Sequence, residues 1–533
     1  MGKYFNITGV CIPDLHYMVN IDGRLAEIKR MVDRGDYFVI NRGRQYGKTT
    51  TLHSLRQALT SDYFVLMLSF EAITEKVFEN ENTFCRRFLL MLHTTFQHEE
   101  LGGIPLYIRE ECEKLIDTGE SGLDFWVLDE FITRLCKESG KPVVLMIDEV
   151  DSAGNHQVFL SFLALLRKKF LERSTLVTFQ SVILAGVYDI KNLKLKIRKD
   201  DERHYNSPWN IAAKFNVDMR FSADGIAGML EEYEKKNQTG MLTNEISGLI
   251  RDYTSGYPVL VSMICKIMDE DIPGSELFPD LCSAWTKEGF FEAIRLLVND
   301  TNLLFDDMIK KILEYPELYT MLHDILFLNQ KYSFNINTFE INLGFMFGFI
   351  DKNSKNNAVV IANRIFEMML NMFFLSEAEF KKTTDLTRLK NINQFTKNGY
   401  LNMDLVIKKF AEYYTEVYRD NDQSFLEKNG CKIFLMHLKQ IINGTGNYYR
   451  EAQTFDNTQM DIVVDYMGKQ HVIELKIWRG AAYHEDGESQ ICHYLDKLKL
   501  DKGYMLIFNY NKGKTTGTKL KDVNGKIISE TMI

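Results

Sequence analysis

The chain has 533 residues, of which 45% are hydrophobic and 26% charged, and its formal net charge is −9. This length exceeds what one hydrophobic core usually supports, so about three or four domains are expected. The net negative charge argues against a mostly positive surface of the kind that attracts nucleic acid. Eight cysteines without metal-ligand spacing indicate reduced thiols in a cytoplasmic protein. No apolar run approaches the ~18 residues of a membrane span, so no membrane partner is expected.

The first informative pattern is a strand, a loop and a helix near the amino terminus. Residues 37–40 form a short apolar strand, and residues 41–50 follow as a polar loop that contains Gly47-Lys48-Thr49. Backbone N–H groups of such a loop, together with the start of the next helix, favour phosphate oxygens. We therefore expect ATP to bind here, with Lys48 on the β- and γ-phosphates and Thr49 on Mg²⁺. The other predicted nucleotide-binding residues are Gly43, Gly47 and Thr50.

A second strand supports this interpretation. Residues 143–147 are a continuous apolar run that ends at Asp148-Glu149. A carboxylate at the end of such a strand is a typical Mg²⁺ ligand in ATPases, and the adjacent glutamate can act as the base that polarises the attacking water. A third apolar strand over residues 181–187 would supply the position that senses the γ-phosphate. Apolar strands separated by helical stretches predict a parallel sheet covered on both faces. The alternative is a vestigial fold that no longer binds ATP.

The middle of the chain is mostly helical in pattern. Residues 1–220 are expected to form the ATPase core, and the amphipathic helices of residues 221–300 are expected to form its helical lid. Residues 301–380 show helices followed by a short strand pair, which is typical of a winged-helix-like module that binds DNA or packs against the ATPase. Residues 381–404 have few large apolar clusters and form the best linker. Residues 405–533 then make a C-terminal domain.

The last quarter of the chain carries spaced acidic residues and a lysine. Residues 459–464 and 471–476 are apolar strands joined by a tight turn, which predicts a hairpin. Asp461 opens the first strand, while Glu474 and Lys476 alternate along the second and so share one face. Two carboxylates can hold a hard cation, and a lysine beside them can activate water and neutralise charge on a phosphate. The alternative is a surface hairpin with an ion pair between Glu474 and Lys476.

This stretch resembles the PD-(D/E)XK nuclease superfamily, whose core motif is an Asp, a gap and then Glu-x-Lys. Glu427 stands where that superfamily often places an acid on its first helix, and Gln490-Ile491-Cys492-His493-Tyr494 is similar to its Gln-x-x-x-Tyr motif. The first motif departs from the pattern because it reads Met-Asp rather than Pro-Asp. The resemblance implies a site on the C-terminal domain that binds Mg²⁺ or Mn²⁺. Its catalytic residues would be Asp461, Glu474, Lys476, Glu427 and Gln490, with Asp461, Glu474 and the Leu475 carbonyl as metal ligands.

The two ends, in this order, resemble a bacterial family of AAA-ATPase-like proteins that carry a C-terminal PD-(D/E)XK domain. Residues 42–48 are similar to an arginine-rich version of the phosphate loop, in which Arg42 replaces the usual first glycine. The resemblance implies an α/β multi-domain fold: a P-loop NTPase parallel sheet with a helical lid, a winged-helix-like module and a C-terminal α/β restriction-endonuclease-like domain.

The function implied by this resemblance is an ATP-binding and ATP-hydrolysing switch that controls a metal-dependent nuclease. DNA is the expected nucleic acid in preference to RNA, and a homo-oligomer formed through the ATPase or a protein regulator is a possible partner. Two alternatives remain open. One is a signalling-type ATPase that acts on a protein partner. The other is an ATP-dependent adaptor whose nuclease-like domain binds nucleic acid without cleaving it.

Overall fold

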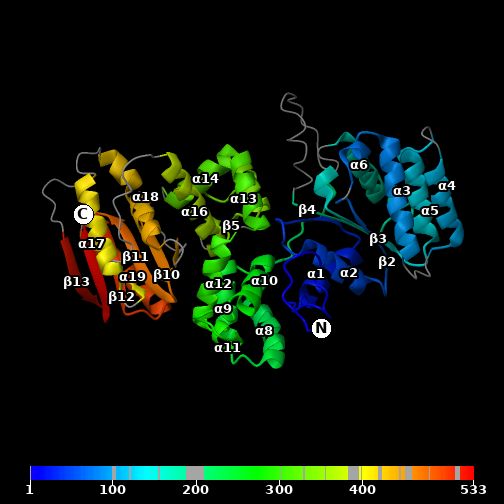
Figure 1. The fold of residues 1–533 in the computed structure, drawn as a ribbon. Helices are drawn as coiled ribbons and strands as arrows, with labels where there is room; N and C mark the ends of the chain where they lie inside the picture. The colour runs from blue at the N-terminus through cyan, green and yellow to red at the C-terminus, as the bar shows by residue number, and fades with distance from the viewer. Residues whose placement is uncertain are drawn as a thin grey trace. The chain divides into compact units, whose positions relative to one another are not determined.

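The computed structural model folds into two compact units, Met1–Arg220 and Phe221–Ile533 (Figure 1). Each unit is described by itself. The described residues are 2–71, 73–98, 104–118, 122–153, 156–187, 209–300, 302–327, 330–353, 356–381, 395–397, 399–417, 423–442, 446–450, 459–478, 481–509 and 517–533.

The first unit is built on a four-stranded sheet with the strand order β1-β4-β3-β2. Its strands are β1 (Tyr37–Asn41), β2 (Phe64–Ser69), β3 (Val143–Asp148) and β4 (Ser181–Gly186). Every pairing between neighbouring strands is parallel, which confirms the predicted parallel α/β sheet. Strand β2 was not predicted from the sequence. Its register places Ser69 beside Asp148, so β2 and β3 end together at the edge where the predicted Mg²⁺ ligand lies.

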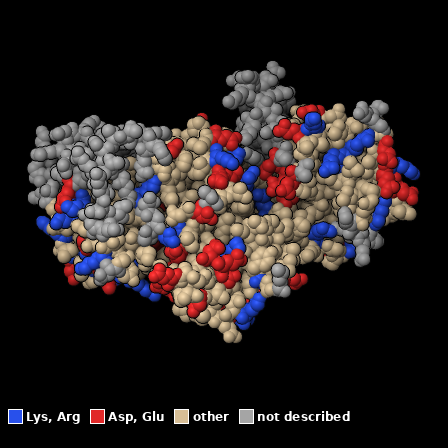
Figure 2. Space-filling view, in the orientation of Figure 1, with Lys and Arg blue, Asp and Glu red and all other residues tan. Residues whose placement is uncertain are grey.

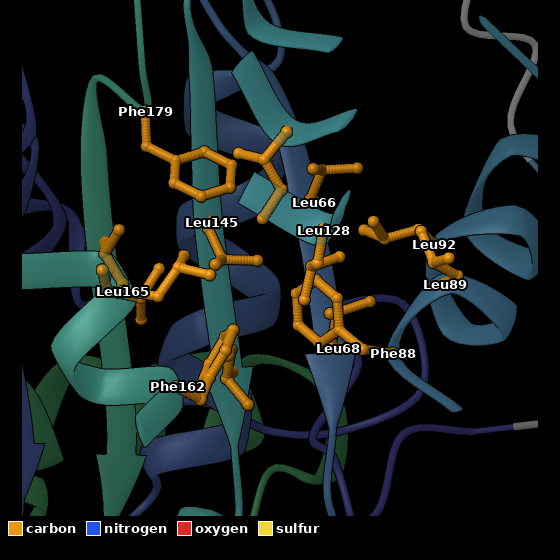
Figure 3. Close-up of a cluster of buried hydrophobic side chains, with 14 of the residues drawn as sticks. Leu66, Leu68, Phe88, Leu89, Leu92, Leu128, Leu145, Phe162, Leu165 and Phe179 are labelled. Carbon is orange, nitrogen blue, oxygen red and sulfur yellow. The ribbon is translucent and has the colours of Figure 1, made fainter. Parts of the chain in front are cut away.

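Helices cover both faces of this sheet. Alternate strand residues enter two separate cores, as in β3, where Leu145 joins one core and Met146 the other. One core contains side chains of α1 (Asp22–Asp33) and α2 (Lys48–Leu59). The larger core contains side chains of α3 (Glu81–His98), α5 (Phe125–Glu138) and α6 (Gln157–Glu172), while α4 (Leu106–Asp117) packs on α3 and α5. Figure 3 shows Leu66 and Leu145 of the sheet facing Leu128 and Phe162 of these helices.

The second unit begins with helices. Its first helical segment contains α8 (Ala223–Asn237), α9 (Thr243–Thr254), α10 (Pro258–Lys266) with a π-helical turn (Ile267–Asp271), α11 (Leu281–Ala284) and α12 (Lys287–Asn299). The next contains α13 (Leu303–Glu314), α14 (Pro316–Phe327), α15 (Phe339–Met346), the antiparallel pair β5 (Ile350–Lys352) and β6 (Val359–Ile361), and α16 (Arg364–Lys381). The assignment of residues 301–380 to a winged-helix-like module stays a prediction. Within the predicted linker, residues 382–394 lie outside the described residues, and a small hairpin of β7 (Thr396–Lys397) and β8 (Tyr400–Leu401) follows.

The C-terminal part of the second unit is a six-stranded mixed sheet with the order β13-β14-β12-β11-β10-β9. Its strands are β9 (Gly446–Arg450), β10 (Gln459–Tyr466), β11 (Lys469–Ile477), β12 (Lys502–Phe508), β13 (Gly517–Val523) and β14 (Lys526–Met532), and its helices are α17 (Met403–Val417), α18 (Gln423–Ile442) and α19 (Ala481–Lys497). On β12, Gly503 lies against Ile491 of α19, whereas Phe508 lies against Gly430 of α18 and the Tyr414 ring of α17. Because residues 503 and 508 point to opposite faces of the strand, α19 covers one face and α17 and α18 cover the other.

Each unit buries one tryptophan almost completely. Trp209 is 0% exposed in the first unit, where its ring packs on Tyr37 of β1. Trp285 is 1% exposed in the second unit, and its Nε1 donates a hydrogen bond to the Tyr233 hydroxyl at 3.0 Å. Because each indole ring is large and enclosed by its neighbours, it restricts how the surrounding side chains can pack.

Among the helices that the structure describes, none combines the length and the apolar composition required to cross a bilayer.

Candidate functional site

The predicted phosphate loop joins β1 to α2 and turns tightly. Gln45 and Gly47 both adopt left-handed backbone conformations, with φ of 54° and 74°. Gly47 caps the start of α2, and Lys48 is the first residue of that helix. The Lys48 side chain is only 5% exposed, and its Nζ donates hydrogen bonds to the carbonyl oxygens of Arg42 at 3.1 Å and Gly43 at 3.0 Å. The ammonium group is therefore held inside the loop that would surround a phosphate.

Thr49 and Asp148 lie together although they are far apart in sequence. The Thr49 hydroxyl donates to Asp148 Oδ2 at 2.6 Å, and the backbone N–H of Glu149 donates to Asp148 Oδ1 at 2.9 Å. A hydroxyl and a carboxylate in contact at the end of a buried strand are oxygen ligands of the type that Mg²⁺ prefers. These two residues therefore fit the metal that the sequence analysis assigned to them.

Glu149 has the environment expected of a proton acceptor. Its φ of 54° places it in the left-handed region, which is uncommon for a glutamate. Burial raises the pKa of its carboxyl, and the neighbouring Asp148 and Asp151 act in the same direction while Lys48 opposes them. Burial also lowers the pKa of the Lys48 ammonium, and the three carboxylates around it partly offset that effect. A raised carboxyl pKa makes Glu149 a better base near neutral pH.

Asp151, for which no role was predicted, lies at the same edge. Its Oδ2 accepts a hydrogen bond from the backbone N–H of Val187 at 2.5 Å, directly after β4. A Cβ on Gly186 would lie 2.7 Å from Asp151 Oδ1, so the glycine makes room for this carboxylate. A short 3₁₀ turn (Val150–Ala153) returns Asp151 to this edge, and the spacing of three residues from Asp148 alone does not reveal that contact.

Two residues of this segment make contacts that were not predicted from the sequence. The Thr50 hydroxyl accepts a hydrogen bond from the backbone N–H of Cys11 at 3.2 Å, so its visible role is to hold the amino-terminal segment. Arg42, which replaces the usual first glycine, donates to the carbonyl of Val217 at 3.1 Å and lies 5.5 Å above the Phe215 ring. The arginine therefore fastens the loop to the segment that follows the sheet.

The second predicted site lies on the hairpin of β10 and β11. Its antiparallel register pairs Asp461 with Glu474 and Gln459 with Lys476. Glu474 is 0% exposed and Lys476 is 2% exposed, with Lys476 Nζ lying 3.4 Å from Glu474 Oε1. The alternative of a surface hairpin is therefore wrong about exposure, although the ion pair between Glu474 and Lys476 that it assumed is present. Burying a carboxylate and an ammonium on one strand is costly, which is why such pairs are usually functional or otherwise compensated.

Helix α19 closes over this pair through a glycine. A Cβ placed on Gly487 would lie 1.7 Å from Lys476 Nζ and 3.0 Å from Glu474 Oε1. The absence of a side chain at this position therefore creates the space that the lysine occupies. Gln490, three residues further along, is half-buried on the same helix, and residues three apart share one side of a helix. Gln490 was predicted from the sequence as a residue of this site, whereas Gly487 was not.

Other predicted residues of this site are only partly placed. Asp461 lies in β10 and Glu427 in α18, but the side chains of both are outside the described part of the structure. Helix α18 packs on the face of the sheet opposite to α19. Leu475, which lies between Glu474 and Lys476 in the sequence, is buried. Among the side chains that are described, no group of three or more His, Cys, Asp or Glu residues could hold a metal ion.

A comparison with known protein families finds a match for most of the first unit and for the helices that follow it. The family described as an AAA-like domain matches residues 18–334. The chain belongs to the AAA-like family. The AAA-like match contains the phosphate loop and Asp148, and it ends before the C-terminal sheet. No curated protein matches the chain.

Three solved structures are similar to this AAA-like chain. A Walker-type ATPase of Pyrococcus abyssi is 13% identical, with a TM-score of 0.47, and the match covers 69% of this chain and 99% of that one. The ORC2 protein of Aeropyrum pernix in its ADP form is 12% identical, with a TM-score of 0.37 and coverage of 70% and 98%. The ORC1 protein of Aeropyrum pernix in complex with DNA is 12% identical, with a TM-score of 0.28 and coverage of 68% and 94%.

Within the second unit, the first helical segment of the AAA-like chain contacts the C-terminal sheet through buried polar groups. The Tyr253 hydroxyl of α9 donates a hydrogen bond to Asp465 Oδ2 of β10. The Arg364 guanidinium lies 5.2 Å from the Tyr253 ring centre and 4.5 Å from the Tyr449 ring centre. Asp465 is four residues from Asp461 on the same strand. The contact therefore joins a helix of residues 221–300 directly to the strand that carries a predicted metal ligand.

The surface charges of the second unit are mixed. On the face shown in Figure 2, acidic side chains gather over the helices of residues 221–300. Several lysines of the C-terminal sheet are paired with carboxylates, as Lys502 is with Asp404 at 2.7 Å and Lys526 with Asp496 at 3.2 Å. Such pairing reduces the positive charge that the sheet offers to a phosphate backbone.

Proposed function

We propose that this AAA-like protein is an ATP-hydrolysing switch whose C-terminal sheet is a divalent-metal-dependent nuclease that acts on DNA. The observation that carries the nuclease half is the complete burial of Glu474 and Lys476 side by side on β11, with Asp461 as the register partner of Glu474. A buried acid and a buried ammonium on the central hairpin of a sheet have no role in solubility. They agree with a site built for phosphate chemistry.

In the nucleotide site, Lys48 would bind phosphate oxygens, and Thr49 with Asp148 would hold Mg²⁺. Glu149 would accept a proton from the water that attacks the γ-phosphate. The contact of Thr49 with Asp148 and the raised pKa of Glu149 support these roles.

In the C-terminal site, Asp461, Glu474 and the Leu475 carbonyl would hold Mg²⁺ or Mn²⁺, while Glu427 and Gln490 support the site. The bound cation would polarise the scissile phosphate and lower the pKa of the attacking water. Lys476 would orient that water and neutralise charge that develops on the phosphate. Because Gly487 has no side chain, the space under α19 at this position is left to Lys476. The glycine would thereby fix the position of the lysine.

The two activities would be coupled through the contact between Tyr253 and Asp465. A change in the helices of residues 221–300 would act on β10 at Asp465, four residues from Asp461. Tyr253→Phe removes the hydrogen bond and keeps the ring. We expect this variant to cleave DNA with less dependence on ATP than the parent protein.

The test is cleavage of supercoiled and linear DNA with Mg²⁺ or Mn²⁺, with and without ATP. Lys476→Met and Glu474→Gln keep side-chain size, and each should lower cleavage by at least about 100-fold. Lys499→Ala, an exposed lysine just beyond α19, is the matched control and should cleave like the parent. Equal cleavage by the parent and both site variants, with all of them folded, would reject the nuclease assignment.

A protein partner is the second candidate function. It is favoured by the acidic surface of residues 221–300 and by the pairing of the C-terminal lysines with carboxylates. In that case the purified protein would hydrolyse ATP but leave DNA intact under every metal condition. Stimulation of ATP hydrolysis by an added protein, unaffected by Lys476→Met, would favour this function over the first.

A further inference from the structure

The Asp151 side chain joins the ends of two neighbouring strands in the first unit. Strand β3 leads into the 3₁₀ turn that carries Asp151, and the pairing between β3 and β4 ends at Leu184. Beyond that point, Asp151 Oδ2 accepts a hydrogen bond from the backbone N–H of Val187 at 2.5 Å. A hydrogen bond to a carboxylate is shorter and roughly twice as strong as one between neutral groups. On the β3 side, Asp151 therefore holds the end of β4 where the strand pairing has stopped.

The close fit between this carboxylate and β4 depends on Gly186. A Cβ at that position would lie 2.7 Å from Asp151 Oδ1, 3.0 Å from its Cγ and 3.1 Å from its Oδ2. The whole carboxyl group therefore lies against the glycine backbone. A side chain at residue 186 would push the carboxylate away from the N–H of Val187, so the glycine and the aspartate depend on one another.

The peptide group that Asp151 holds also holds the start of the phosphate loop. This group joins Gly186 to Val187, and its C=O accepts a hydrogen bond from the N–H of Arg42 at 3.2 Å. An N–H donated to a carboxylate polarises its peptide group and makes the C=O a stronger acceptor. The Arg42 carbonyl in turn accepts a hydrogen bond from Lys48 Nζ at 3.1 Å. Three successive hydrogen bonds thus lead from the Asp151 carboxylate to the ammonium group inside the loop.

We propose that Asp151 is a positioning residue for ATP hydrolysis, which acts on Lys48 through the end of β4 and the start of the phosphate loop. This role deepens the proposed function and rests on its ATP-hydrolysing half. Without the carboxylate, the peptide group after Gly186 would lose one of its two anchors, and Lys48 would lie less accurately against the transferring phosphate. ATP binding also uses the backbone N–H groups of the loop. We therefore expect kcat to change more than KM.

The test is steady-state ATP hydrolysis by the full-length protein and its variants. Asp151→Ala should lower kcat by at least about 10-fold and change KM by less than about 3-fold. Asp151→Asn keeps an oxygen that can accept from the Val187 N–H, so its kcat should stay within about 3-fold of the parent value. Glu110→Gln, which changes an exposed carboxylate of α4, is the matched control and should hydrolyse ATP like the parent.

Gly186→Ala tests the same contact from the side of β4. The new Cβ would displace the carboxylate, so kcat should fall by at least about 10-fold in the parent. In the Asp151→Ala background the clash is gone, and the same substitution should lower kcat by less than about 2-fold more. Gly186→Ala also retains the charge of Asp151, so it carries the test if Asp151→Ala fails to fold by circular dichroism.

The outcomes separate this role from the proposed function. If the parent hydrolyses ATP and Asp151→Ala has the kcat of the parent, the positioning role is rejected while ATP hydrolysis stands. Losses in Asp151→Ala and Gly186→Ala that add fully in the double variant would also reject it, because the two residues would then act independently. A parent protein that does not hydrolyse ATP would reject the proposed hydrolysis and this role with it.

Discussion

Replacement of Gly487 by alanine tests the proposed nuclease site most directly. The new Cβ would lie 1.7 Å from Lys476 Nζ, and ordinary contact begins at 3.4 Å, so Nζ must move by about 1.7 Å. Misplacing a reacting group by about 1 Å can reduce a rate by about 100-fold. We therefore expect Gly487→Ala to lower DNA cleavage by at least about 100-fold.

The same substitution should change stability much less than activity. Alanine in a helix is favoured over glycine by up to about 1 kcal/mol, and overpacking costs about 1–3 kcal/mol. The clashing atom is the end of a flexible side chain, so the net loss in unfolding free energy should stay near about 1–2 kcal/mol, or a few degrees in Tm. Thermal unfolding by circular dichroism measures this term separately from cleavage.

Gly228→Ala is the matched control for this experiment. Gly228 lies in α8, and a Cβ there would meet nothing within 4 Å. This variant should cleave DNA like the parent and unfold at a slightly higher temperature. If Gly487→Ala is folded and retains cleavage within about 3-fold of the parent, the position of Lys476 does not control the chemistry and the reasoning is refuted.

Three further predictions concern other parts of the molecule. Lys48→Ala should weaken ATP binding by at least about 10-fold in calorimetric titration, because a charged phosphate contact is lost, whereas the exposed-lysine variant Lys235→Ala should not. Gly256→Ala should destabilise the second unit by about 3 kcal/mol in denaturant unfolding. The reason is that Gly256 has φ of 74° and that its Cβ would lie 2.1 Å from the Phe221 carbonyl oxygen. A variant as stable as the parent would contradict this prediction. The folded-state pKa of Asp465, about 6, lies above its usual 3.8. The folded protein therefore holds this proton more tightly, and its unfolding free energy relative to Asp465→Asn should fall by roughly 3 kcal/mol as pH rises through this interval. Denaturant unfolding across that pH range checks the sign, and parallel pH profiles for the two proteins would contradict it.

The parallel sheet could be predicted because its strands are continuous apolar runs bounded by turn residues. Strands β1, β3 and β4 were identified on that basis, and the end of β3 located Asp148 correctly. Strand β2 was missed because its short apolar run has the same composition as the neighbouring helices. Composition does not separate a buried strand from a buried helix when the run is short.

The candidate sites were predictable only where local spacing determines position. The pairing of Asp461 with Glu474 follows from a hairpin with a tight turn, since the turn fixes the register. Gly487 and Asp151 could not be found in this way. Their roles depend on how α19 packs on β11 and how a 3₁₀ turn returns to the end of β4, and both are tertiary contacts.

The buried tryptophans give each unit its own spectroscopic reporter. Trp209 and Trp285 lie in different units, while Trp126 is 65% exposed and Trp478 is half-buried. Replacing Trp126 and Trp478 by phenylalanine, and then either Trp209 or Trp285, gives single-tryptophan proteins whose emission follows one unit at a time. Red shifts at different denaturant concentrations would mean that the units unfold independently, and coincident shifts would mean that they unfold as one cooperative system.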